Sequence, residues 1–298
     1  MPVSSQLPVE LWTCIFGYLH IGHIVDFSAT CKYNSLLVRH YILSRHHQLA
    51  AQFFHDPDKL YRLLYTCQAV ISGSGALYLL QPLFTASWMP NNLDIYVSSD
   101  NLQFLLSALS IEGYWDTHAF APQVRSYKHS HVLMTITLAR AQQTIDVVVT
   151  ATYSTICPIF LCHSTLLMNF ITHDALYCAY PRLTLCGLSL IHPFVAYDTI
   201  LNRASIDTLL KYHRCEFTYL TCYHVHHHFC CFKHNPRKLH DKYSMWVITR
   251  SSPFAPRSHP DTYARLGIVD AKWCLGGELC SSDSKLASST VHVLLDSE

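Results

Sequence analysis

Two carboxylates in this chain stand alone inside apolar runs and are placed where they could hold a metal ion. Asp94 lies in the run at 93–97, and Asp146 lies in the β-branched run at 144–149. Such runs are typical of buried strands that present a single acid. Upstream, a glycine-serine turn at 72–75 follows an apolar run and precedes a predicted helix. Carboxylates are ligands for Mg²⁺, and glycines let a backbone approach a phosphate, so these residues predict a metal-dependent site.

The order of these residues resembles the nucleotidyltransferase fold. That fold has a Gly-Ser turn, an Asp-x-Asp pair on the next strand and a third Asp on a later strand. The matching residues in this chain are Gly73, Ser74, Asn92, Asp94 and Asp146. The resemblance implies a mixed-sheet α/β domain in which the turn binds a nucleotide. It also implies that the carboxylates hold two Mg²⁺ ions, which clamp the attacking and leaving oxygens.

Asn92 occupies the position at which the resemblance expects the first Asp. An amide offers one oxygen but no negative charge, and it cannot bridge two cations as a carboxylate does. Losing one bridging ligand removes several kcal/mol of transition-state stabilisation, on the order of a thousandfold in rate. We therefore expect a domain that kept its strands and lost its chemistry. The alternatives are a two-metal enzyme that uses Asn92, Asp94 and Asp146, nucleotide binding with one metal or none, and an accidental match.

At the N-terminus, Leu7-Pro8-Val9-Glu10-Leu11 is followed by Ile15, Phe16 and Leu19 and then by Leu36-Leu37-Val38. This pattern resembles an F-box over about the first 45 residues. Its apolar residues fall at helical spacing, and a proline suits the first helical turn. The residues expected to bind a partner are Leu7, Pro8, Leu11, Ile15, Phe16 and Leu19. Further helices are predicted at 24–30 and 34–45. The resemblance implies docking on a Skp-type adaptor of a cullin ubiquitin ligase, and the alternative is a helical hairpin that belongs to the following domain.

Later residues extend the resemblance over nearly the whole chain, to a family of fungal proteins that combine an F-box-like start with a nucleotidyltransferase-like domain. They are 163–171, 180–184, Trp273, Gly276, Gly277 and Cys280. In that family the strand that contains Asn92 usually reads Asp-Leu-Asp-Ile-Tyr. The predicted fold class is α+β. We expect an F-box-like helical unit at 1–47, a connecting helix at 48–68, and a nucleotidyltransferase-like domain with a C-terminal extension at 69–298.

A cysteine- and histidine-rich segment follows at 222–234. Thiolate and imidazole are preferred zinc ligands, and Cys222, His224, Cys230 and His234 could close a tetrahedron. The spacing matches no standard zinc finger, and three consecutive histidines cannot all face one ion. The favoured interpretation is a strand pair with buried cysteines and solvated histidines.

Composition indicates a folded intracellular chain. Half of the 298 residues are hydrophobic, 14% are charged and the net charge is +1, so a large core is expected and no field attracts nucleic acid. The 13 cysteines and the lack of a secretory signal indicate reduced thiols in the cytoplasm or nucleus. The uncharged stretch at 147–171 contains several polar residues and Pro158, which predicts a buried strand, a loop and a helix rather than a membrane span.

The remaining elements complete the predicted core. Residues 101–109 are expected to form a short helix, and the alternating run at 130–139 is expected to pair with the strand at 144 through a turn at 140–143. Together these patterns predict an F-box-type adaptor whose second domain recognises an unknown protein or a nucleotide-like ligand. The alternative is a metal-dependent nucleotidyltransferase with an unknown acceptor.

Overall fold

The computed structural model describes residues 7–116, 131–152, 154–192, 203–220, 237–239, 241–249, 271–273 and 275. Within these residues the chain forms eight α-helices and one mixed sheet of eight strands, together with two small two-stranded sheets. The predicted α+β class is therefore confirmed.

The large sheet contains the strands that carry the candidate site. Its members are β1 (Val70–Ser72), β2 (Asn92–Ser98), β3 (Trp115–Asp116), β4 (Val132–Arg140), β5 (Gln143–Thr150), β6 (Asn169–Ile171), β7 (Ala175–Cys178) and β11 (Met245–Ile248). They lie in the order β11-β7-β6-β1-β2-β5-β4-β3. The central pair β2 and β5 is parallel, and every other neighbouring pair is antiparallel. The predicted hairpin is β4 and β5, whose last paired residues are Arg140 and Gln143.

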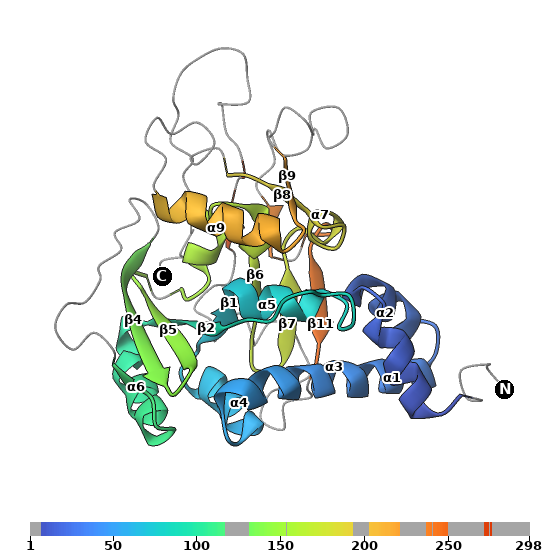
Figure 1. Cartoon of the computed structure of the whole chain (residues 1–298), viewed down its shortest axis with the longest axis horizontal. Helices are drawn as coiled ribbons and strands as arrows, with labels where there is room; N and C mark the ends of the chain where they lie inside the picture. The colour runs from blue at the N-terminus through green and yellow to red at the C-terminus, as the bar shows by residue number, and fades with distance from the viewer. Residues whose placement is uncertain are drawn as a thin grey trace, which may run out of the picture.

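The two faces of β2 and β5 have different surroundings. In β2 the side chains of Leu93, Ile95 and Val97 are fully buried in the main core, whereas the residues between them are only partly buried. Because successive side chains of a strand point to opposite faces, Asn92 and Asp94 face away from this core. Figure 1 shows α9 (Arg203–Arg214) on one side of the molecule and α3 (Lys32–Phe53) on the opposite side.

Four helices precede the sheet. Besides α3 they are α1 (Val9–Gly17), α2 (Ile21–Ser28) and α4 (Pro57–Thr66). Pro8 is the N-cap of α1 rather than its first residue. The Cys31 sulfur accepts a hydrogen bond from the backbone N–H of Asn34 at the start of α3, and Asp56 caps α4 with Pro57 as its first residue. These local signals set where the helices begin.

The helix α3 joins the N-terminal helices to the sheet domain without a break. It has 22 residues, so the expected third helix at 34–45 is longer than predicted and the domain boundary at 47 falls inside it. No glycine or proline interrupts it, and buried residues lie along its whole length. In its middle, the Arg45 guanidinium donates to the carbonyl oxygens of Tyr78 and Gln81 at 2.9 and 2.7 Å. The N-terminal helices are thus attached rigidly to the sheet domain.

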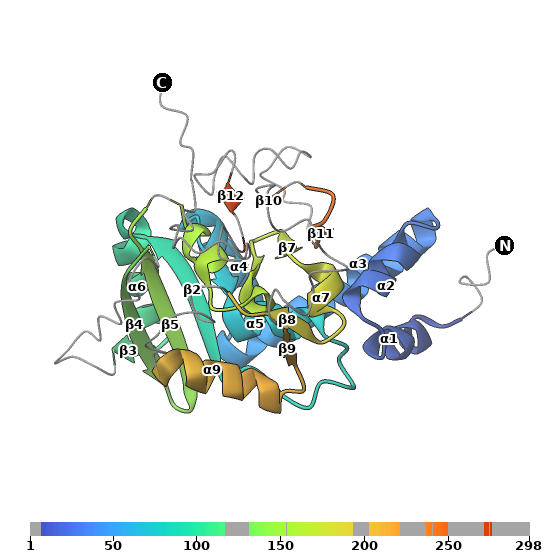
Figure 2. The same ribbon diagram turned by 90° about the horizontal axis from the view of Figure 1, so that it is seen from above.

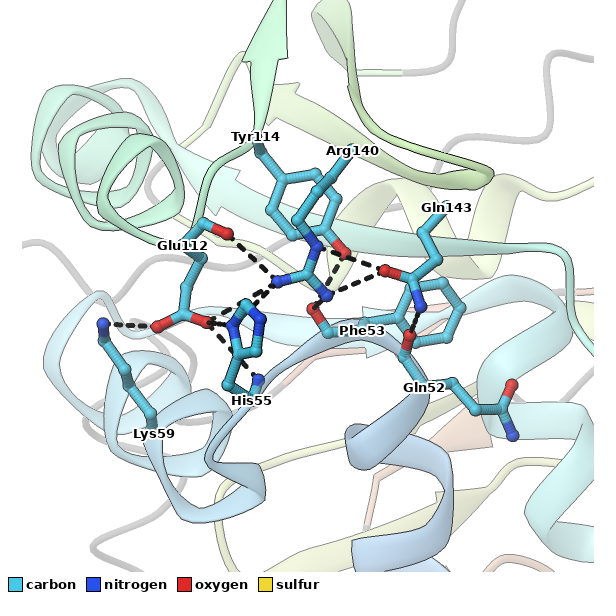
Figure 3. Close-up of polar contacts among 8 residues, drawn as sticks. All are labelled: Gln52, Phe53, His55, Lys59, Glu112, Tyr114, Arg140 and Gln143. Atoms are coloured by element: carbon cyan, nitrogen blue, oxygen red, sulfur yellow. Dashed lines mark hydrogen bonds and ion pairs between the residues drawn. The ribbon is translucent and has the colours of Figure 1, made fainter.

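A polar network fixes the C-terminal end of α3 to the sheet (Figure 3). The Arg140 guanidinium donates to the carbonyl oxygens of Phe53 and Glu112, at 2.8 and 3.0 Å. The buried Glu112 carboxylate accepts a hydrogen bond from Lys59 and lies 3.2 Å from the His55 ring nitrogen. The α3–α4 junction, the end of α6 and strand β4 therefore meet at one buried acid.

The other elements surround this core. They are α5 (Gly73–Leu80), α6 (Leu102–Ile111), α7 (Pro181–Thr184), β8 (Leu188–Leu190), β9 (Thr218–Leu220), β10 (Arg237–Lys238), β12 (Lys272–Trp273) and the 3-10 helices η2 (Ser99–Asn101), η3 (Cys157–Leu161) and η4 (Thr165–Leu167). Figure 2 shows α9 running beside β5 and β2 when the molecule is seen from above. The helix expected within 147–171 is instead the two short 3-10 helices and strand β6. Pro158 has no N–H to continue a helix, and the residues of β6 pair with β1 and β7.

None of the described helices is long and apolar enough to cross a membrane. The eight cysteines in the described part of the chain are all free thiols.

Candidate functional site

The parallel pairing of β2 and β5 brings the two predicted carboxylates together. Asp94 lies opposite Asp146, and Asn92 lies opposite Thr144. Because the two strands run in the same direction and are in register, both acids point to the face away from the main core. Sequence residues 52 positions apart thus form one site.

The glycine turn lies directly against the first acid. Strand β1 pairs with β2 so that Ser72 is opposite Asp94, and α5 begins at the next residue, Gly73. Gly73 has a φ of +63°, and a Cβ placed there would lie 1.9 Å from Asp94 Oδ2. Only glycine allows this approach. The backbone N–H of Ser74, in the first turn of α5, donates to the Asp94 carboxylate. The buried Ser74 hydroxyl has no hydrogen-bond partner among the residues that the structure describes.

The Asn92 amide links the two carboxylates. Its Nδ2 group donates to Asp94 Oδ1 at 2.9 Å and to Asp146 Oδ2 at 2.8 Å. The Thr137 hydroxyl of β4 donates to Asp146 Oδ1 at 2.6 Å. An aspartate at position 92 would place a third acceptor here, whereas the amide supplies two N–H donors. The acids are therefore held by protein hydrogen bonds at the position where the resemblance expects a cation.

This donor set does not fit a two-metal centre. Two carboxylates converge, but the third group presents N–H donors between them rather than an oxygen. Among the described residues, no group of three or more His, Cys, Asp or Glu side chains is arranged to hold a metal ion. The predicted zinc ligands Cys222, His224, Cys230 and His234 lie outside the described residues, as do Gly276, Gly277 and Cys280.

Electrostatics at the site favour the protonated form of Asp94. Burial, and then the negative charge of Asp146, raises the pKa of Asp94 to about 7, although Lys211, the Ser74 N–H and the Asn92 amide act in the opposite direction. A carboxyl next to a second carboxylate ionises less readily because like charges repel. Asp94 therefore changes between its protonated and ionised forms near neutral pH.

Three further side chains interact electrostatically with Asp94, and sequence reasoning did not find them. Lys211 and Tyr212 come from α9, and Cys162 follows η3. Burial raises the pKa of the Cys162 thiol to about 12, and the charge of Asp94 adds to this effect. No motif marks these residues, because the packing of α9 over the sheet brings them to the site. Thr137 was also missed, but the predicted hairpin contained the signal, since its turn sets Thr137 opposite Asp146.

The predicted partner-binding residues divide between surface and core. Leu11 and Ile15 are exposed by 48% and 40%, and Pro8 is also exposed. Leu7 is partly buried, and Leu19 packs against the core. Phe16, in contrast, is fully buried among aromatic rings, so it supports the helices from inside and does not face a partner. Other exposed apolar residues of these helices, outside the predicted partner-binding set, are Val9, Tyr18, Tyr33 and Leu36.

The chain matches no family model, no curated protein and no solved structure.

Proposed function

We propose that this chain is an F-box-type adaptor whose nucleotidyltransferase-like domain recognises a protein or a ligand without catalysis. In this proposal the N-terminal helices dock on a Skp-type adaptor of a cullin ubiquitin ligase, and the sheet domain is a pseudoenzyme. The observation that carries the proposal is the exposed apolar stripe on α1.

The stripe consists of Leu11, Ile15 and Tyr18, which are four and three residues apart. Residues at this spacing lie on one side of a helix, and all three side chains are exposed. The opposite side of α1 carries Phe16, which is fully buried. One apolar side of α1 is thus packed inside the protein, and the other faces solvent. A protein partner with an apolar groove would cover the exposed side.

The absence of catalysis is supported by the Asn92 amide. It donates to both carboxylates, and so takes up oxygen atoms that a catalytic Mg²⁺ ion would need. The face that carries these acids would then serve recognition.

The test of the adaptor role is a binding measurement with a purified Skp-type adaptor. We expect the Leu11→Arg/Ile15→Arg double variant to weaken binding at least a hundredfold, because two apolar contacts are replaced by charges. The matched control is Ile206→Arg/Leu210→Arg, which changes two exposed residues at the same spacing on α9. The control should bind like the unmodified chain. If the unmodified chain does not bind the adaptor, the proposal is wrong.

A second candidate function is favoured by the direct pairing of Asp94 with Asp146 beside Gly73. It is a metal-dependent nucleotidyltransferase, in which a half turn of the Asn92 amide would present its oxygen to Mg²⁺. Calorimetry with Mg²⁺ and each of the four ribonucleoside triphosphates tests it, with Asp94→Ala as the inactive control. Heat that depends on Mg²⁺ and disappears in Asp94→Ala would support the enzyme, and the lack of heat with any of the four would exclude it.

Mn²⁺ binding by the variant Asn92→Asp tests whether the site is a metal centre that lost one ligand. The substitution restores the third carboxylate, so Mn²⁺ binding that appears in the variant and not in the unmodified chain would show that one residue separates the two states. No gain of Mn²⁺ binding would mean that the site has diverged further than Asn92.

A further inference from the structure

We propose that the docking surface for the ligase adaptor extends beyond the N-terminal helices onto the sheet domain, through Phe84. The inference rests on the proposed adaptor function and specifies which part of the sheet domain the partner touches. It concerns the loop at 81–91, called here the strap, which joins α5 to β2.

The strap places an aromatic ring at the end of the apolar stripe of α1. The Phe84 ring packs beside the Tyr18 ring, with their centroids 5.0 Å apart. Both side chains remain largely exposed, Phe84 by 52% and Tyr18 by 64%. Two large aromatic rings that contact each other and still face solvent are typical of protein interfaces, where aromatic residues are enriched.

The position of Phe84 is fixed by the backbone of α1. The Phe84 N–H donates to the Gly17 carbonyl oxygen at 2.9 Å. A Cβ on Gly17 would lie 2.2 Å from the Phe84 ring, so the ring occupies space that only glycine leaves free. The contact is therefore a specific feature of the N-terminal helices and the strap together.

The strap is also anchored at its other end. Trp88 packs edge-to-face against Tyr78 of α5 and Tyr212 of α9, with centroid distances of 5.9 and 6.5 Å. Four residues later the chain enters β2 at Asn92. Figure 1 shows this loop passing close to α2 before it returns toward β2. One short segment therefore connects the surface of α1 with the face that carries Asp94.

The partner that we expect to contact Phe84 is the same adaptor that would bind the apolar stripe of α1. Leu11, Ile15 and Tyr18 lead along α1 toward Gly17 and Phe84, so the apolar surface is continuous across the two parts of the chain. The strap contains no charged residue, and α1 contains only one, Glu10. A partner on the stripe that extends past the end of α1 would meet Phe84 and bury it with Tyr18.

This arrangement would fix the direction in which the recognition face points. The partner would bind α1 and the strap together. The helix α3 then continues from the N-terminal helices into the sheet domain without a break. The face that carries Asp94 and Asp146 would then be held at one orientation relative to the ligase. A flexible tether would instead allow many orientations.

The experiment compares two exposed phenylalanines by calorimetric titration with a purified Skp-type adaptor. Phe84→Ala should weaken binding about tenfold or more, as expected for an aromatic contact inside an interface. The control is Phe104→Ala, which removes a ring exposed by 56% on α6, on the side of the molecule away from α1. The control should bind like the unmodified chain, and thermal unfolding of each variant shows whether the fold is kept.

A photo-crosslinking amino acid at position 84 or at position 104 supplies a second measurement that does not depend on a truncated side chain. We expect crosslinks to the adaptor from position 84 only. If the unmodified chain binds the adaptor, but Phe84→Ala binds equally well and position 84 gives no crosslink, this inference is wrong while the adaptor function stands. If the unmodified chain does not bind at all, both are wrong.

Discussion

The raised pKa of Asp94 makes a quantitative prediction about stability. Replacing Asp94 by Asn removes an acid that is unfavourable in its folded surroundings when it is ionised. The amide oxygen of the new residue can still accept hydrogen bonds from the Ser74 N–H and the Asn92 amide, so the geometry of the site should be kept.

The sign follows from proton linkage. The pKa of Asp94 is 3.8 in the absence of the fold and about 7 within it, so the folded chain holds this proton more tightly than the unfolded chain. Stability from this group is therefore fully present below pH 4, decreases as the pH rises to about 7, and is constant above that. Since each unit of pKa corresponds to about 1.4 kcal/mol, ionised Asp94 lowers the free energy of unfolding by roughly 4 kcal/mol at pH 8.

The assay is urea unfolding of the unmodified chain and Asp94→Asn at several pH values between 4 and 8. We expect the variant to gain stability relative to the unmodified chain as the pH rises, with most of the gain between pH 5 and 7 and a total of about 4 kcal/mol. Asp100→Asn removes an exposed carboxylate and controls for the change in net charge. A stability difference that stays constant from pH 4 to pH 8 would refute the reasoning.

Two further substitutions test the supports of the site and of the sheet. Gly73→Ala should reduce the free energy of unfolding by about 3 kcal/mol, because this position has a left-handed backbone and the new Cβ overlaps Asp94. Gly113 also has a left-handed φ, but a Cβ there would make only ordinary van der Waals contact, so Gly113→Ala should lose about 1 kcal/mol in the same urea assay. Burial acts to raise the pKa of Glu112, but hydrogen bonds, led by that from Lys59, lower it overall. Glu112→Gln should therefore cost about 2 kcal/mol at pH 7, and the loss should shrink below pH 4.5, where the stability that the carboxylate provides disappears as it protonates. A loss for Glu112→Gln that is the same at pH 3.5 and pH 7 would contradict this account.

Local patterns predicted most of the elements near the site. The alternating run at 130–139 and the turn that follows it predicted the β4–β5 hairpin, and the caps and spacing predicted helices near α1, α5 and α6. The prediction ended α3 too early because helices end at breakers or caps, and nothing between Arg45 and Leu49 is either. The segment after β5 was predicted as a loop and a helix. It contains 3-10 turns and a strand instead, because its apolar residues are buried on all sides and so show no helical or strand periodicity.

What the sequence determined by itself is the set of groups at the site and their faces. Glycine at position 73, the amide at 92 and the acids at 94 and 146 are fixed by residue type, and the two-residue period of a strand puts Asn92 and Asp94 on one face of their strand. Only the tertiary structure decided that Asp146 lies opposite Asp94 on the same face, that the Asn92 amide joins the two acids, and that Lys211 and Tyr212 of α9 interact electrostatically with Asp94. The physical reason is that parallel pairing and helix packing depend on contacts between distant parts of the chain, which local spacing does not encode. The same holds for the contact of Phe84 with Gly17, which neither segment reveals alone.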